Sequence, residues 1–103
     1  MRRFDVFRNP SGSKDSPFVL LVQHELLDAL STRVVAPLVR RSVVGPSLIS
    51  RLNPCWTIEK TEVVMLTQQL GAVRVGSLSA RVCSLAAKST EIIGALDVLF
   101  SGV

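Results

Sequence analysis

The stretch Ser84-Leu-Ala-Ala-Lys-Ser-Thr-Glu-Ile-Ile-Gly-Ala-Leu-Asp-Val-Leu-Phe-Ser-Gly-Val103 has a hydrophobic period that the rest of the chain lacks. Its apolar residues recur at the spacing of one helix face, at Leu85, Ile92, Leu96, Leu99 and Val103. Ser84 or Ser79 is suited to cap the first turn, and Gly102 stands where a C-terminal glycine would end the helix. The pattern predicts one C-terminal helix over about residues 84–101.

The chain before this helix, over about residues 3–77, has the shorter periods and the turn residues that are typical of β-strands. Arg3–Phe7 alternates apolar and polar residues, and Phe18–Gln23 is a continuous run of long and β-branched residues. Asn9–Pro17 lies between them and is rich in proline, glycine and serine, which favour turns. These segments predict a hairpin whose second strand is buried.

Further strand-like segments follow. Arg33–Val39 contains Pro37, which cannot donate to a strand ladder, so we expect an edge strand or a bulge there. Ser42–Pro54 carries Gly45-Pro46 and Asn53-Pro54 and predicts a surface loop. The remaining predictions are a hairpin of Cys55–Ile58 and Val63–Thr67 around Glu59–Glu62, a turn at Gln68–Gly71 and a strand at Ala72–Val75.

Length and composition indicate one small globular domain. The 103 residues suit a single domain, 1–103, and an apolar content of 48% is too high for a disordered chain. Short strands followed by one helix predict a mainly β fold, a small antiparallel barrel or sheet with the helix packed on it. The net charge of +4 is compatible with a nucleic acid or an acidic protein as partner.

Residues that could carry chemistry are few. His24 is the only histidine, and we interpret it as a solvated residue at a strand end. Cys55 and Cys83 have no ligand spacing and are expected to be reduced. No glycine-rich phosphate loop or acid–base carboxylate pair is present, so we expect no catalytic residue, metal or cofactor. No signal segment or membrane span is evident, which predicts a cytoplasmic protein.

Basic residues gather in the middle of the chain. Between Asp28 and Glu59 there is no acid, whereas Arg33, Arg40, Arg41 and Arg51 all fall there. They form either an anion-binding patch for RNA phosphates or an acidic protein, or an ordinary solvated face. The chain has no tyrosine, and Trp56 lies in a strand-like stretch where a core position is expected. This scarcity of stacking residues weakens the RNA interpretation, and no direct nucleic-acid contact is expected.

The C-terminal helix has more apolar surface than one narrow stripe. Ile92, Ile93, Leu96, Leu99 and Phe100 cover a wide arc, so one side can pack on the sheet and another on a second copy. The alternative is an ordinary helix with a wide buried face. We expect a homodimer.

Several segments in order resemble the CcdB family. They are Val22-Gln23-x-x-Leu26-Leu27-Asp28, Arg33-Val-Val-Ala-Pro-Leu38, Met65-Leu66-Thr67 and the ending Phe100-x-Gly102-Val103. The similarity runs nearly from Arg3 to Val103 and is weakest in Ser42–Asn53. The resemblance implies an SH3-like barrel of the type shared by CcdB and MazF toxins, with one C-terminal helix.

The same resemblance implies a function. Members of this family are type II toxins that bind the A subunit of DNA gyrase as homodimers and trap the gyrase–DNA cleavage complex. They are not enzymes. A cognate CcdA-like antitoxin with a disordered C-terminal tail wraps the dimer and neutralises it.

Site residues follow from the resemblance by position. The expected gyrase contacts are Leu26, Leu27, Asp97, Phe100, Ser101, Gly102 and Val103, and the expected dimer contacts are Leu26, Leu27, Leu96 and Phe100. Ser101 departs from the pattern, because the best-known member has a tryptophan there that anchors the gyrase contact. Two alternatives stay open: a MazF-like toxin that cleaves messenger RNA, and a non-poisoning homologue retained as an antitoxin-binding protein.

Overall fold

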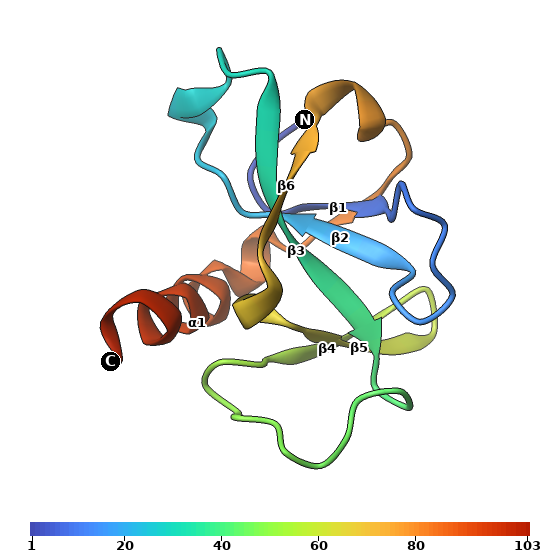
Figure 1. The fold of residues 1–103 in the computed structure, drawn as a ribbon, viewed down its shortest axis with the longest axis vertical. Helices are drawn as coiled ribbons and strands as arrows, with labels where there is room; N and C mark the ends of the chain where they lie inside the picture. Colours follow the sequence, from blue (N-terminus) through green and yellow to red (C-terminus); the bar gives the residue numbers. More distant parts are fainter.

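The computed structural model describes residues 1–103, and Figure 1 shows a curled sheet with one helix packed against it. The strands are β1 (Asp5–Arg8), β2 (Phe18–Leu21), β3 (Thr32–Arg40), β4 (Cys55–Ile58), β5 (Thr61–Met65), β6 (Gly71–Arg74) and β7 (Arg81–Ser84). The α-helix α1 is Ser89–Ser101, and the short 3-10 turns are η1 (Glu25–Leu27), η2 (Thr67–Gln69), η3 (Val75–Ser77) and η4 (Ala86–Lys88). No helix has the length and hydropathy needed to cross a bilayer.

The sheet is antiparallel throughout and has two open ends. Its strands lie in the order β4-β5-β3-β2-β1-β7, and β6 pairs with the first part of β3. Because β4 and β7 do not pair with each other, the sheet is a half-barrel. The predicted mainly β, SH3-like arrangement of short antiparallel strands with one C-terminal helix is confirmed.

The first hairpin is buried on both faces. β1 and β2 pair antiparallel around the predicted loop, with Val6 opposite Leu20. Leu20 faces the main core, which α1 covers with Ile92 and Ala95. Its neighbours Val19 and Leu21 face a smaller cluster on the other side of the sheet, which Leu78 closes. Burial on two faces explains why this strand is apolar throughout.

Pro37 does not mark an edge strand or a bulge, as the sequence had led us to expect, because β3 is the central strand. Its first part pairs with β6 up to Val35 and its last part pairs with β5 from Leu38. Pro37 lies between these two partners, and its carbonyl accepts a hydrogen bond from Leu66 N–H at 3.1 Å. The N–H that proline lacks would point to this same side, where the neighbouring strand changes, so no ladder bond is lost there.

The second hairpin has a shorter turn than predicted. β4 and β5 pair from Ile58 opposite Thr61, which leaves two turn residues rather than the four of Glu59–Glu62. Glu59 and Lys60 have φ angles of 49° and 65°. Two successive residues with positive φ form the turn that suits strand twist, although asparagine and glycine are its usual residues. The sequence carries no such signal.

The start of the helix was predicted too early. Residues 81–84 form β7, which pairs with β1, and α1 begins at Ser89 rather than near Ser84. Leu85 packs on the main core as its apolar period suggested, but its N–H donates to the carbonyl of Phe4 at 2.8 Å and prolongs the strand pairing. Neither Ser79 nor Ser84 caps α1. Ser84 Oγ instead accepts from Ala86 N–H at the η4 turn.

The predicted loop between β3 and β4 is present and is fastened at its end. Asn53 is buried and donates through Nδ2 to the carbonyl of Met65 at 3.0 Å. Thr67 is also buried, and its hydroxyl donates to the carbonyl of Leu52. These side chains hold the loop against the end of β5. Trp56 follows on β4 and is a core residue, as predicted.

Candidate partner-binding surface

One side of α1 fixes the helix to the sheet. Ile92 and Ala95 are fully buried, and Leu96 packs half-buried on the same core. Trp56 on β4 donates from Nε1 to Glu91 Oε2 at 3.4 Å, which joins the first turn of the helix to the sheet edge. The first two turns of the helix therefore hold it against the sheet.

The opposite side of α1 carries an exposed stripe. Ile93, Asp97, Phe100 and Ser101 follow the spacing of one helix face and are all exposed. Phe100 is 73% exposed, which is unusual for a phenyl ring in a small monomer. The structure thus brings three predicted contact residues onto one stripe. Ile93 was missing from the predicted set, although its spacing of four from Asp97 and seven from Phe100 places it there.

The end of the helix is a glycine cap, as predicted. Gly102 has a φ of 73° and its N–H donates to the carbonyl of Val98 at 3.0 Å. Only glycine adopts this left-handed conformation without strain. Val103 follows and is 69% exposed. We name this whole surface the helix tip: Ile93, Asp97, Phe100, Ser101, Gly102 and Val103.

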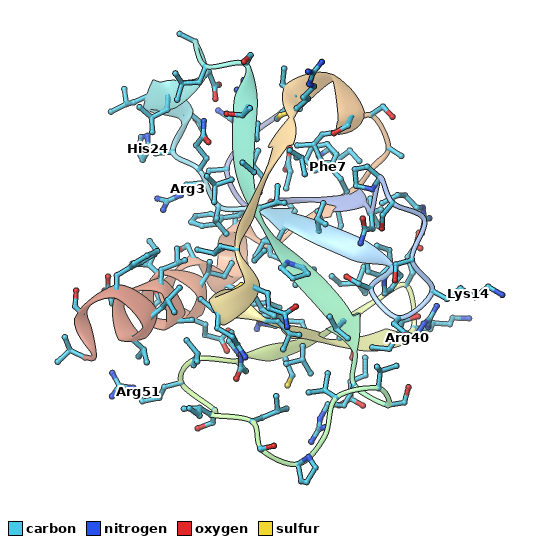
Figure 2. The ribbon with its side chains drawn as sticks, in the orientation of Figure 1. Arg3, Phe7, Lys14, His24, Arg40 and Arg51 are labelled. Atoms are coloured by element: carbon cyan, nitrogen blue, oxygen red, sulfur yellow. The ribbon has the colours of Figure 1, made fainter.

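A second exposed apolar surface lies on η1. Leu26 is 86% exposed, and Leu27 and Leu30 are also exposed. His24 begins the turn, and its Nδ1 accepts a hydrogen bond from Leu26 N–H at 3.0 Å. Figure 2 shows His24 at the surface, so it is solvated as expected, but it begins η1 and lies three residues after the end of β2 rather than at a strand end. We name Leu26, Leu27 and Leu30 the η1 ledge.

Two buried polar side chains support the η1 ledge from below. Gln23 donates through Nε2 to the carbonyls of Leu27 and Thr32 at 3.3 and 3.2 Å. Its Oε1 accepts from Val34 N–H at 2.9 Å. The guanidinium of Arg33 donates to the carbonyls of Asp28, Leu30 and Thr32. The turn is thus fixed by one side chain that precedes it, Gln23, and by one from the strand that follows it, Arg33.

Arg33 is not part of an anion-binding patch, because it is only 6% exposed. Its charge faces Asp28, with Nε 3.7 Å from Oδ1. The two terminal nitrogens of the guanidinium donate to backbone carbonyls, whereas the buried Nε has no hydrogen-bond partner. Sequence reasoning missed this role, because Arg33 and Arg40 both adjoin the same apolar strand and only the fold distinguishes them. Arg40, Arg41 and Arg51 do reach the surface, but Figure 2 shows Arg51 well apart from Arg40.

Within one chain, the helix tip and the η1 ledge are separate. Figure 1 shows η1 (cyan) and the C-terminal end of α1 (red) at different corners of the molecule. The structure therefore brings Asp97, Phe100 and Ser101 together but does not join them to Leu26 and Leu27. Leu96, a predicted dimer contact, lies half-buried against its own core. The dimer contacts stay a prediction.

The surface offers little chemistry. Cys55 and Cys83 are free thiols, and burial raises the pKa of Cys83 above its ordinary value, which disfavours the reactive thiolate. No three histidine, cysteine, aspartate or glutamate side chains come together as a metal site would require. What the two apolar surfaces can do is bind another protein.

Comparison with known proteins agrees with these observations. The family model described as CcdB protein matches residues 3–102, which is nearly the whole chain. A search of the curated proteins finds no sequence that matches this chain. CcdB proteins are toxins of toxin–antitoxin systems, and the family is not one of enzymes. By fold and by this match, the chain belongs to the CcdB family.

Proposed function

We propose that this protein is the toxin of a type II toxin–antitoxin pair, and that it binds the A subunit of DNA gyrase and traps the gyrase–DNA cleavage complex. The observation that carries the proposal is the helix tip. The exposed Phe100, in line with Ile93 and followed three residues later by the exposed Val103, makes an apolar surface with no partner in its own chain. Such surfaces on small proteins mark partner-binding sites.

The helix tip has the form of a protein-binding site. Binding energy in protein interfaces is concentrated in a few aromatic and apolar anchors surrounded by polar residues. Phe100 supplies the aromatic anchor, and Asp97 and Ser101 supply polar neighbours on the same stripe. Because Ser101 occupies the position of the family's tryptophan, Phe100 carries more of the contact here.

The separation of the two apolar surfaces supports a homodimer. A two-fold axis can place the η1 ledge of one copy near the helix of another, which one chain cannot do alone. A stable interface of this kind buries about 1,600 Å² in total. The antitoxin is the second partner, and we expect its disordered tail to cover a wider area than gyrase does.

The proposal is tested with purified gyrase and supercoiled plasmid. The protein should cause linear DNA to accumulate after denaturation of the trapped complex, and added antitoxin should reverse this. A long mixed-sequence RNA incubated with the same preparation should stay intact. RNA cleavage without linear DNA would replace the proposal with a ribonuclease. Antitoxin binding with neither activity would identify a non-poisoning homologue.

A further inference from the structure

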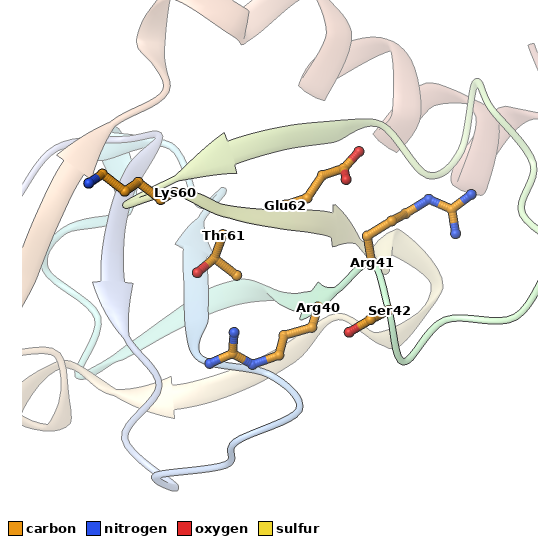
Figure 3. A pocket seen from close by; sticks show the side chains of 6 residues that line it. All are labelled: Arg40, Arg41, Ser42, Lys60, Thr61 and Glu62. Atoms are coloured by element: carbon orange, nitrogen blue, oxygen red, sulfur yellow. The ribbon is translucent and has the colours of Figure 1, made fainter.

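A third surface, separate from the two apolar ones, is strongly basic. The end of β3 and the turn between β4 and β5 line a shallow hollow of about 420 Å³ whose residues are Arg40, Arg41, Ser42, Lys60, Thr61 and Glu62. Figure 3 shows Arg40, Arg41 and Lys60 spread along its rim rather than pointing at one centre. The loop before β2 adds Lys14, whose carbonyl accepts from Arg40 Nε at 2.7 Å. We name Lys14, Arg40, Arg41 and Lys60 the basic face.

The charges of the basic face are not neutralised within the chain. None of its four cations takes part in a salt bridge, because the three ion pairs of the protein lie elsewhere. The neighbouring Glu59 is already paired with Arg8 at 2.8 Å. Asp15 and Glu62 are the nearby acids, so the face keeps an excess of positive charge. Like charges held together favour an anionic partner.

The shape and composition of the basic face indicate which kind of anion it can bind. The rim arrangement suits a chain of phosphates rather than one small anion, because the cations diverge. No hydrophobic residue lines the hollow, so the apolar and aromatic anchors of a protein hot spot are absent. No aromatic side chain lines it either, so unpaired bases have nothing to stack on. A double-stranded nucleic acid, read only through its backbone, fits these conditions best.

We propose that the basic face binds the phosphate backbone of double-stranded nucleic acid without sequence preference. This revises the expectation of no direct nucleic-acid contact, which rested on the scarcity of stacking residues and outweighed the four arginines of the central stretch. The fold removes Arg33 from that set by burial and adds Lys14 and Lys60 from other segments. Figure 1 shows the turn and loop that carry the basic face on the side away from the C-terminal end of α1. The helix tip therefore stays free when the basic face is occupied.

The test is fluorescence anisotropy of a short labelled mixed-sequence duplex over a range of salt concentrations. Each phosphate contact contributes about 0.9 to the slope of log affinity against log salt, so four cations give a slope near −3.6. Affinity should therefore fall by about 100-fold between about 50 and 200 mM salt. Binding by duplex DNA or duplex RNA of the same sequence supports the proposal, and comparing the two identifies the natural source.

Variants of equal charge separate the basic face from net charge. The first is Lys14→Gln with Arg41→Gln and Lys60→Asn, because asparagine tolerates the positive φ of Lys60. It should weaken binding and reduce the magnitude of the salt slope by about 2.7. The control is Arg51→Gln with Arg74→Gln and Lys88→Gln, which removes the same charge from exposed positions elsewhere. The control should keep the wild-type slope.

Three results would overturn the proposal. One is the absence of duplex binding by the wild-type protein at the lowest salt. Another is a control variant that loses as much of the slope as the basic-face variant. The third is tighter binding of polyglutamate than of duplex, lost in the basic-face variant, which would assign the surface to an acidic protein instead. Melting curves of all variants accompany the binding data. They should match the wild type, because none of the replaced side chains makes a hydrogen bond or salt bridge in the structure.

Discussion

The η1 ledge and the helix tip both expose large apolar side chains, but they are held in place in different ways. The ledge is a turn that has no buried residue of its own. Gln23 and Arg33 hold it by hydrogen bonds to its carbonyls. The helix tip is the last part of a helix whose core contacts are centred on Ile92 and Ala95. Its position depends on helix rigidity and on the cap at Gly102.

Because of this difference, substitutions at the helix tip should affect binding without affecting stability, whereas substitutions that disturb the η1 ledge should affect both. A change at the helix tip alters what a partner meets while the core stays intact. A change in the support of the η1 ledge alters buried hydrogen bonds and hence folding itself. Substitutions at the two surfaces should therefore have different effects, and the largest is expected at the end of α1.

Deleting Gly102 and Val103 should abolish growth inhibition in cells and hardly change the melting temperature. The removed residues are exposed and contribute nothing to either core cluster. Antitoxin binding should weaken less than toxicity, because its expected surface is wider. The checks are a growth assay, thermal melting and an antitoxin pull-down. A truncated protein that still inhibits growth would remove the C-terminus from the active surface.

Replacing Arg33 with leucine should lower the free energy of unfolding by about 2–3 kcal/mol. The guanidinium is buried and serves three backbone carbonyls, which lose their donors together. Urea denaturation measures the effect. Arg74→Leu is the matched control, since Arg74 is exposed on β6 opposite Thr32, and it should change stability by about 0.5 kcal/mol or less. Equal effects from the two changes would show that Arg33 does not support the ledge.

Replacing Ser101 with tryptophan should strengthen gyrase binding about tenfold or more, which corresponds to about 1.4 kcal/mol. Tryptophan adds a large rigid apolar surface beside Phe100 on the same stripe. Titration against the purified A subunit of gyrase measures the gain. Ser50→Trp, in the exposed loop before β4, controls for unspecific stickiness. No gain over this control would mean that gyrase does not contact the end of α1.

Replacing His24 with alanine should have the smallest effect, a loss of about 0.5–1 kcal/mol felt mainly within η1. The imidazole accepts the hydrogen bond of Leu26 N–H and has no other role in the structure. Amide hydrogen exchange should show faster exchange at Leu26, whereas α1 keeps its protection. Faster exchange along α1 as well would indicate that the two surfaces are coupled.

The sequence predicted those parts of the fold that depend on neighbouring residues. The turn chemistry of Asn9–Pro17 marked a hairpin, and the continuous apolar run after it marked a doubly buried strand. Gly102 marked the helix end because a left-handed cap is a local requirement. The apolar period over Ile92, Leu96 and Leu99 correctly gave the inner face of the helix, whereas Val103, assigned to the same face, is exposed beyond the helix end.

What the sequence did not predict depends on residues that are distant along the chain. Arg81–Ser84 became a strand because β1 offers an open edge, which no local period reveals. Pro37 is tolerated in the central strand because its two neighbours β5 and β6 meet there. Arg33 is a buried clamp because η1 folds back over it. In each case, a tertiary contact outweighed the local preference.

The same limit applies to the predicted contact residues: the sequence places together those on one element but not those on different elements. Phe100, Ser101 and Asp97 lie on one exposed stripe, as one helix dictates, but their relation to Leu26 and Leu27 depends on a second copy. The basic face could not be read from the chain, because Lys14 and Lys60 reach Arg40 only through two hairpins that fold together.

One titration decides whether the helix tip binds gyrase. Phe100→Lys and Val43→Lys add the same charge at two exposed apolar positions, the first on the helix tip and the second in the loop after β3. The account predicts that Phe100→Lys weakens binding to the purified A subunit of gyrase by about 30-fold or more, the loss of a hot-spot residue, whereas Val43→Lys binds like the wild type. Equal affinity of the two variants for gyrase would contradict it.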